Sequence, residues 1–253
     1  MCELLGISSA RPIDVSAYLK TFYAHSVLHP HGWGLMYENG GERMFLREAV
    51  RAVDNTYLGD VITSLEPQKT LLGHIRLATV GTVCEENCHP FTGRDLTGRE
   101  WTLIHNGTIY SGKLNYQYYK RQRGDTDSER VFLALLDAVN EGIKLGKHSD
   151  HERFETVSHF IAQIAPRNKL NLMIWDGELL YVHKNLKNTL SYQRTEDGCI
   201  FCTQPLNDGT WIPFPIAQVI AFRDGEPVFR GERHKGIYVP TLAYISAMDA
   251  MHI

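Results

Sequence analysis

The 253 residues include 26 basic and 29 acidic side chains, for a formal net charge of -3, and 43% of the chain is hydrophobic. This near balance of charge argues against a protein that binds nucleic acid or a membrane surface. No hydrophobic run reaches the roughly 18 residues of a transmembrane helix, and the start lacks the regions of a signal peptide, so we expect a cytoplasmic protein.

Hydrophobic periodicity predicts strands at both ends of the chain and helices in the middle. The first half predicts a strand over residues 2–7, a helix over 13–23, a hairpin of strands 33–38 and 42–46, a helix over 57–65 and a strand over 70–77. A loop rich in Gly, Asn and Pro then reaches a strand over 101–104, which leads into His105-Asn106-Gly107.

Two long helices are predicted next, over residues 127–143 and 151–164, and the pattern from Thr126 to Glu129 predicts a capping box. The last third predicts strands over 170–175, 179–183, 199–203 and 218–222, with a hairpin signal at Asp224-Gly225. The even composition, without repeats or linkers, indicates a single domain over residues 1–253. Strands at both ends with helices between them favour the α+β class over a doubly wound parallel sheet.

The five cysteines are odd in number, which favours reduced thiols in a chain of this kind. Cys84 and Cys88 have a C-x3-C spacing and Cys199 and Cys202 a C-x2-C spacing, both of which resemble zinc sites. Strand positions three apart face opposite sides, however, so the second pair is poorly placed for chelation. We expect no metal and no organic cofactor, and we interpret these four cysteines as buried or loop thiols.

The cysteine at position two is the first candidate for chemistry. A small second residue permits removal of Met1, which would give Cys2 a free α-amine with a pKa of about 8. Such an amine can accept the proton of the adjacent thiol, directly or through water, so that one residue supplies both nucleophile and base. The structural alternative is a small residue in a buried first strand.

The dipeptide Asn106-Gly107 is the second candidate. A side-chain amide followed by a glycine N–H at the end of a buried strand can form an oxyanion hole. Asn-Gly is also a common turn dipeptide, which is the structural alternative here.

Two charged residues complete the set. Arg76, near the end of an apolar strand, requires an anionic partner, either an internal carboxylate or that of a ligand. Asp127 lies in the first turn of a predicted helix, where the helix dipole favours it, or it can bind a substrate ammonium. Together they match the two charged ends of a free amino acid. With a nucleophile and an oxyanion hole, they indicate glutamine or another γ-glutamyl amide as the substrate.

The order of these motifs resembles that of the class II glutamine amidotransferases, which use an N-terminal nucleophile. The matching segments are Met1-Cys2-Glu3-Leu4-Leu5-Gly6, His31-Gly32-Trp33-Gly34, Gly73-His74-Ile75-Arg76-Leu77-Ala78-Thr79, Asn87-Cys88-His89-Pro90-Phe91, His105-Asn106-Gly107 and Asp125-Thr126-Asp127-Ser128-Glu129. The opening segment and Thr203-Gln204-Pro205-Leu206 resemble the short, stand-alone YafJ-like branch.

This resemblance implies a four-layer αββα sandwich of two mostly antiparallel sheets, the Ntn-hydrolase fold. It implies that Cys2 is the nucleophile, with its own amine as base, and that the Asn106 side chain and the Gly107 N–H hold the oxyanion. The implied substrate-binding residues are Arg76 for the α-carboxylate, Asp127 for the α-ammonium, Thr79 beside the carboxylate, and Trp33 and His89 as residues that shape the pocket.

The sequence departs from the glucosamine-phosphate synthase branch at Val80, where that branch has a histidine, so one carboxylate contact is missing or replaced. No synthase domain is expected after the matching region. We therefore interpret the chain as a hydrolase of glutamine or a γ-glutamyl small molecule, acting through a Cys2 thioester. The alternatives are a glutaminase subunit that delivers ammonia to a separate synthase, and a catalytically quiet binding protein with the same fold. An amidase of the bile-salt and penicillin type is a further alternative, but it would not need Arg76 and Asp127.

Overall fold

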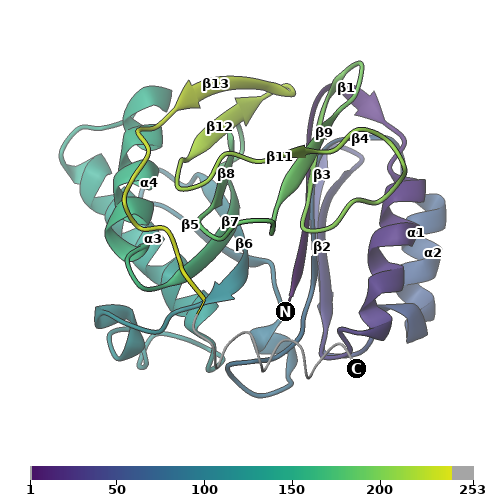
Figure 1. Cartoon of the computed structure of the whole chain (residues 1–253), viewed down its shortest axis with the longest axis horizontal. Coiled ribbons are helices and arrows are strands. Elements are labelled where there is room, and N and C mark those ends of the chain that lie inside the picture. The colour runs from purple at the N-terminus through teal and green to yellow at the C-terminus, as the bar shows by residue number, and fades with distance from the viewer. Residues whose placement is uncertain (1, 241–253) are drawn as a thin grey trace.

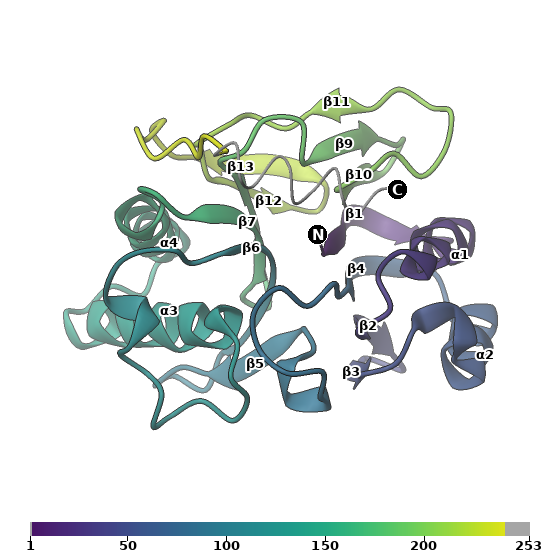
Figure 2. The ribbon, with the colours of Figure 1, turned by 60° about the horizontal axis from the view of Figure 1, so that its bottom comes forward.

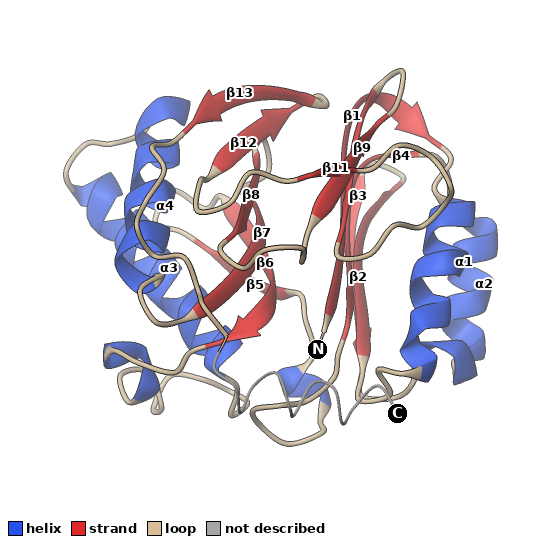
Figure 3. Cartoon of the chain, viewed as in Figure 1, coloured by secondary structure: helices blue, strands red, loops and turns tan. Residues whose placement is uncertain are grey.

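Two β-sheets lie face to face in the computed structural model, which describes residues 2–240, and a pair of helices covers the outer face of each sheet (Figure 1). Figure 3 shows the same four layers by secondary structure, with helices on the outside and strands in the middle. Because every strand pairing between residues 2 and 240 is antiparallel, the structure confirms the predicted α+β sandwich.

The seven-stranded sheet has the order β11-β9-β10-β1-β4-β2-β3. Its strands are β1 (Glu3–Ile13), β2 (Trp33–Asn39), β3 (Glu42–Glu48), β4 (Gln68–Ile75), β9 (Ser191–Arg194), β10 (Gly198–Cys202) and β11 (Ile212–Pro213). The helices α1 (Ser16–Ala24) and α2 (Thr56–Ser64) cover its outer face, next to the short 3-10 helices η1 (His25–Val27) and η2 (Ala52–Asp54).

The six-stranded sheet has the order β13-β12-β8-β7-β6-β5. Its strands are β5 (Phe91–Arg94), β6 (Glu100–Thr108), β7 (Lys169–Trp175), β8 (Leu180–Lys184), β12 (Ile220–Arg223) and β13 (Glu226–Arg230). The helices α3 (Asp127–Lys144) and α4 (Asp150–Ile164) cover its outer face, and the loops carry the 3-10 helices η3 (Glu85–Asn87) and η4 (Lys113–Asn115).

Strand alternation divides the hydrophobic side chains among three layers of core. In β1, Leu5 and Ile7 pack in the core on the side of α1 and α2, whereas Leu4 lies between the two sheets with Ile104 and Met173. The predicted hydrophobic strands are buried on both faces because each lies between a helix layer and the opposite sheet.

The predicted elements of the sandwich are confirmed, with differences at their ends. β1 continues to Ile13, a residue predicted to start the first helix, and β6 continues through Asn106 to Thr108 instead of turning there. The short strands β5, β9 and β11 were not predicted, while the hairpin signal at Asp224-Gly225 does join β12 to β13. Between residues 2 and 240, no helix is long and apolar enough to cross a bilayer.

Thr126 caps α3 as predicted, because its side chain accepts a hydrogen bond from the Glu129 N–H. The predicted return bond of the capping box is absent: the Glu129 carboxylate accepts from the N–H groups of Arg123 and Gly124 instead. A complete capping box is found at α4, between Ser149 and Glu152. The Glu129 carboxylate thus stabilises the loop that precedes α3.

The cysteines of β10 face opposite sides of their sheet, as the strand argument predicts. Cys199 packs in the core between the sheets, and Cys202 packs in the core beneath α1 and α2. This arrangement rules out joint chelation of one ion by these two thiols.

Candidate active site

Cys2 lies directly before β1, and the strand register places it opposite Arg76. β1 pairs with β4 so that Leu4 lies opposite His74 and Glu3 opposite Ile75, which makes Cys2 and Arg76 the next pair outward. Because Leu4 faces the space between the sheets, alternation directs Cys2 to the same side. Figure 2 shows the start of β1 facing β6 and β7 of the other sheet. The Cys2 Sγ lies 3.5 Å from the carbonyl oxygen of Leu77.

Arg76 is buried, with 3% of its surface exposed, and one of its two terminal guanidinium nitrogens is unpartnered. Its Nη2 donates to the carbonyls of Val80 and Gly81, at 3.1 and 3.4 Å, whereas its Nη1 has no hydrogen-bond partner. No carboxylate of residues 2–240 lies within ion-pairing distance of this guanidinium. The internal ion pair that the sequence left open is therefore not found in the described chain, and the site can bind an anion.

Asn106 lies within β6, on the strand face that looks toward the other sheet. Its Oδ1 accepts a hydrogen bond from the Nζ of Lys169 at 3.2 Å, whereas its Nδ2 is buried and has no partner. The next residue, Gly107, leaves no room for a side chain: a Cβ there would lie 1.9 Å from the Lys169 carbonyl oxygen. The amide donor and the glycine backbone are therefore set by the tight pairing of β6 with β7.

Two buried histidines fill the space beside Arg76. The Nε2 of His74 lies 3.2 Å from the carbonyl oxygen of His105 and so joins the two sheets, and the ring of His89 lies 4.0 Å from that of His74. Burial lowers the pKa of His74 to about 3 and also lowers the pKa of His89. Both rings are therefore uncharged at neutral pH, and they add no cation beside the guanidinium.

Asp127 is the first residue of α3 and is buried. Its Oδ2 accepts a hydrogen bond of 2.7 Å from the N–H of Ile109, which follows β6. The charge of Asp127 also acts to raise the pKa of His105, against the larger lowering effect of burial. These two interactions place the carboxylate at the end of β6 that carries Asn106 and Gly107.

The loop after β4 carries Thr79, which is exposed. The N–H of Ala78 donates to the Nδ1 of His31 at 2.9 Å, and this contact fixes the start of the loop. Farther along, Asn87 is fully buried and joins the loop to the start of α3: its Nδ2 donates to the Thr82 carbonyl, and its Oδ1 accepts from the Asp125 N–H at 2.8 Å. Asn87 therefore connects the loop that follows Arg76 to the segment that precedes Asp127.

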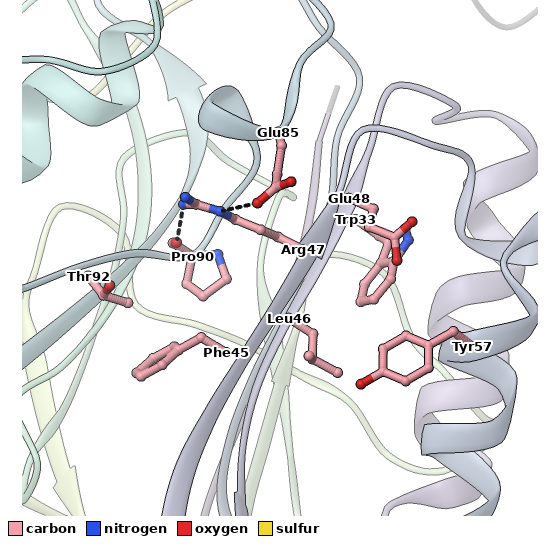
Figure 4. A pocket seen from close by; sticks show the side chains of 9 residues that line it. All are labelled: Trp33, Phe45, Leu46, Arg47, Glu48, Tyr57, Glu85, Pro90 and Thr92. Atoms are coloured by element: carbon pink, nitrogen blue, oxygen red, sulfur yellow. Dashed lines mark hydrogen bonds and ion pairs between the residues drawn. The ribbon is translucent and has the colours of Figure 1, made fainter.

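The structure does not bring Trp33 to this group. Trp33 pairs with Ile75 and packs in the core beneath α1 and α2, edge to face with Tyr23, on the opposite side of the sheet from the predicted direction of Cys2. Figure 4 shows Trp33 instead in a cavity of about 320 Å³ with Arg47, Glu48 and Tyr57, among other residues. The strand alternation that directs Cys2 inward directs Trp33 outward.

Lys169 lies beside these candidate residues, although the sequence motifs did not indicate it. It begins β7, only 2% of its surface is exposed, and its charge interacts with the Cys2 thiol. A signal for it exists: Lys169 and Asn171 are the polar members of an otherwise apolar strand and alternate with Met173 on one face. Only the pairing of β7 with β6, which the sequence does not reveal, brings Lys169 to Asn106.

Comparison with known proteins decides the family. The sequence pattern of the class II glutamine amidotransferases matches residues 1–197. The chain belongs to the class II glutamine amidotransferases. It is similar to YafJ of Escherichia coli K12, named as a glutamine amidotransferase, with 30% identity over 193 residues that make up 74% of each chain.

The chain is also similar to two further proteins. Protein MJ1515 of Methanocaldococcus jannaschii, which is named as uncharacterized, is 28% identical over 267 residues, 92% of this chain and 72% of that protein. A crystal structure of a predicted glutamine amidotransferase from Pseudomonas aeruginosa superposes with a TM-score of 0.65 at 24% identity and covers 90% of this chain and all of that one. The similarity to this crystal structure supports the fold. The αββα layers observed here are those that the family motifs imply.

Proposed function

We propose that this amidotransferase hydrolyses the side-chain amide of glutamine or of a γ-glutamyl compound through a thioester on Cys2. The observation that carries the proposal is the pair of buried, unpartnered donors around the nucleophile: Nη1 of Arg76 and Nδ2 of Asn106. A buried donor without a partner is costly unless a ligand satisfies it. A substrate carboxylate and a developing oxyanion would satisfy these two.

The thiol of Cys2 needs a base, because burial raises its pKa, although the positive charges of Arg76 and Lys169 oppose this shift. In the proposed mechanism Met1 is removed, and the α-amine of Cys2 accepts the thiol proton. The sulfur attacks the δ-carbonyl carbon of the substrate. The resulting oxyanion accepts hydrogen bonds from the Asn106 Nδ2 and the Gly107 N–H.

Collapse of this intermediate breaks the carbon–nitrogen bond, and the leaving amine takes the proton from the α-ammonium of Cys2. A γ-glutamyl thioester remains. Water then gives a proton to the α-amine and attacks the thioester carbonyl, which releases glutamate and regenerates the thiol. Each step needs only groups of this chain and water.

Substrate binding in this proposal uses the opposite charges at the two sides of the site. Arg76, assisted by Thr79, would bind the α-carboxylate, and Asp127 would bind the α-ammonium. The uncharged ring of His89 would form part of the wall beside Arg76. The proposal assigns no contact to Trp33, because Trp33 packs on the helix side of its sheet.

The test is mass spectrometry of the intact protein after incubation with the glutamine analogue 6-diazo-5-oxo-norleucine, together with a steady-state glutaminase assay. We expect a mass without Met1, one covalent adduct, and loss of both adduct and turnover in Cys2→Ala. Asn106→Ala should lower kcat by about 10²–10³-fold while leaving KM nearly unchanged. Retention of Met1 in an active protein, or an adduct that persists in Cys2→Ala, would contradict the mechanism.

A further inference from the structure

Lys169 is the first residue of β7, which pairs with β6, the strand that carries Asn106. β6 and β7 pair so that Asn106 lies opposite Asn171 and Thr108 opposite Lys169. Met173, two residues beyond Asn171 on the same face, packs in the core between the sheets. Lys169 and Asn171 therefore face the same space as Asn106, at the end of the sandwich where the strand register places Cys2.

The contact between Lys169 and Asn106 fixes which way the asparagine amide points. The Lys169 Nζ lies 3.2 Å from Oδ1, and an ammonium group has donors but no acceptor. The amide oxygen must therefore face Lys169, and the amide nitrogen must face away from it. That nitrogen, Nδ2, is the buried donor without a partner. Rotation of the amide by half a turn would place an oxygen where the oxyanion forms.

Lys169 also brings charge to the nucleophile. Its positive charge lowers the pKa of the Cys2 thiol, against the stronger effect of burial, and the Cys2 thiolate in turn raises the pKa of Lys169. Burial is the larger influence on the lysine and lowers the pKa of Lys169 to about 8. The side chain is therefore mostly protonated at neutral pH and can act both as a donor and as a charge.

We propose that Lys169 is a positioning residue, which holds the Asn106 amide with Nδ2 directed at the developing oxyanion and keeps a positive charge beside the Cys2 sulfur. This inference rests on the proposed amide hydrolysis and names a residue that acts through Asn106 and Cys2, without itself touching substrate. A purely structural Lys169, which only fills space between the sheets, would predict a different pattern of kinetic effects.

The test compares three variants of the whole chain. Lys169→Met keeps the length of the side chain and removes both donor and charge, while Lys169→Gln keeps a donor and removes the charge. Lys184→Met is the matched control, because Lys184 is equally buried on the same face of the next strand and donates to the Leu190 carbonyl at 2.8 Å. Glutaminase kinetics and the pH dependence of Cys2 alkylation by iodoacetamide are measured for each, with urea unfolding as a check of folding.

We expect Lys169→Met to lower kcat by about 10²-fold, the scale of losing one oxyanion donor, with KM changed less than about threefold. Its alkylation profile should shift to higher pH, because the thiolate loses a neighbouring cation. Lys169→Gln should recover part of kcat but not the alkylation profile, and Lys184→Met should resemble the parent protein in both. If Lys169→Met does not fold, the alkylation profile of Lys169→Gln carries the same comparison.

The inference is overturned if the parent protein hydrolyses glutamine and both Lys169 variants keep its kcat and its alkylation profile. It is also overturned if Lys184→Met causes the same losses, since the effect would then belong to any buried lysine of this face. A parent protein that hydrolyses no γ-glutamyl amide would contradict the proposed function instead. The alkylation profiles would still decide whether Lys169 acts on the sulfur.

Discussion

The N–H of Ile109 donates a 2.7 Å hydrogen bond to the Oδ2 of Asp127, and this bond joins the end of β6 to the first turn of α3. The residue that the proposal assigns to the substrate ammonium therefore also holds the strand that carries the two proposed oxyanion donors. Because the Oδ2 of Asp127 accepts this bond, a change of Asp127 should affect both substrate binding and the stability of the fold.

Replacement of Asp127 by Asn and by Ala should separate these two roles. Asp127→Asn retains an oxygen that can accept from the Ile109 N–H but loses the charge, so we expect KM for glutamine to rise about tenfold or more with little change in stability. Asp127→Ala leaves a buried N–H without an acceptor and should also lower the free energy of unfolding by about 1–3 kcal/mol. Steady-state kinetics and urea unfolding measure the two effects. An unchanged KM in Asp127→Asn would remove Asp127 from the substrate site.

Arg76→Lys tests the guanidinium as the carboxylate-binding group. Lysine keeps the positive charge but not the planar pair of donors, and a charge-assisted hydrogen bond contributes about 1.5–3 kcal/mol, so KM should rise about 10–100-fold. The control is Arg121→Lys, since Arg121 pairs with Asp137 at the surface on the outer side of α3. If both variants keep the parent KM, the unused Nη1 of Arg76 serves some purpose other than binding the substrate carboxylate.

The apolar signal of strands buried on both faces predicts most of the strands and the α+β class, whereas the four αββα layers are implied by the resemblance to the amidotransferase family. The short strands β5, β9 and β11 were missed, and β11 shows the physical reason: both of its residues are exposed, and it forms a strand by pairing with β9. The same limit applies to the site. Cys2, Arg76 and Asn106 are predicted from local motifs, whereas the contact of Lys169 with Asn106 joins positions 63 residues apart and depends on strand register.

The alternation of side chains along β2 explains why Trp33, which was predicted to shape the pocket, lies on the other side of the sheet. A motif places Trp33 near the other site residues in sequence order, but sequence order does not say which face of β2 it occupies. Because Trp33 lies opposite Ile75 and both face the helices, its indole packs on the far side of the sheet. We expect Trp33 substitutions to act on stability and on the cavity of Figure 4 before they act on glutamine binding.

Replacement of two glycines, Gly34 and Gly59, by alanine should change the free energy of unfolding in opposite directions. A Cβ at Gly34 would lie 1.7 Å from the His89 carbonyl oxygen, so β2 and the loop carrying His89 would have to separate. We expect Gly34→Ala to lower the free energy of unfolding by about 3 kcal/mol and to reduce activity as His89 moves. Gly59 lies exposed within α2, and a methyl group there would meet no atom within 4 Å, so Gly59→Ala should add about 0.5–1 kcal/mol. Urea unfolding of both variants gives the comparison, and a stable, active Gly34→Ala would show that the loop can move freely.

The buried histidines should make the protein less stable in mild acid. His74 has a pKa of about 3 in the folded chain because of burial, below the value of about 6.5 for an exposed histidine. As the pH falls below 6.5 the unfolded chain binds a proton that the native state cannot, so the free energy of unfolding decreases. Between pH 6.5 and 5 this one residue should account for about 1.5 kcal/mol of the decrease.

His74→Gln removes this titration while retaining a donor that can reach the His105 carbonyl. The variant should therefore lose less stability than the parent between pH 6.5 and 5, by the amount given above, when both are unfolded with urea at each pH. His151→Gln makes the same exchange at a side chain that is 62% exposed and serves as the matched control. Equal pH dependence in the parent and His74→Gln would mean that His74 takes up its proton in the folded state. The hydrogen bond from His74 to the His105 carbonyl, which joins the two sheets, would then come from a charged imidazolium.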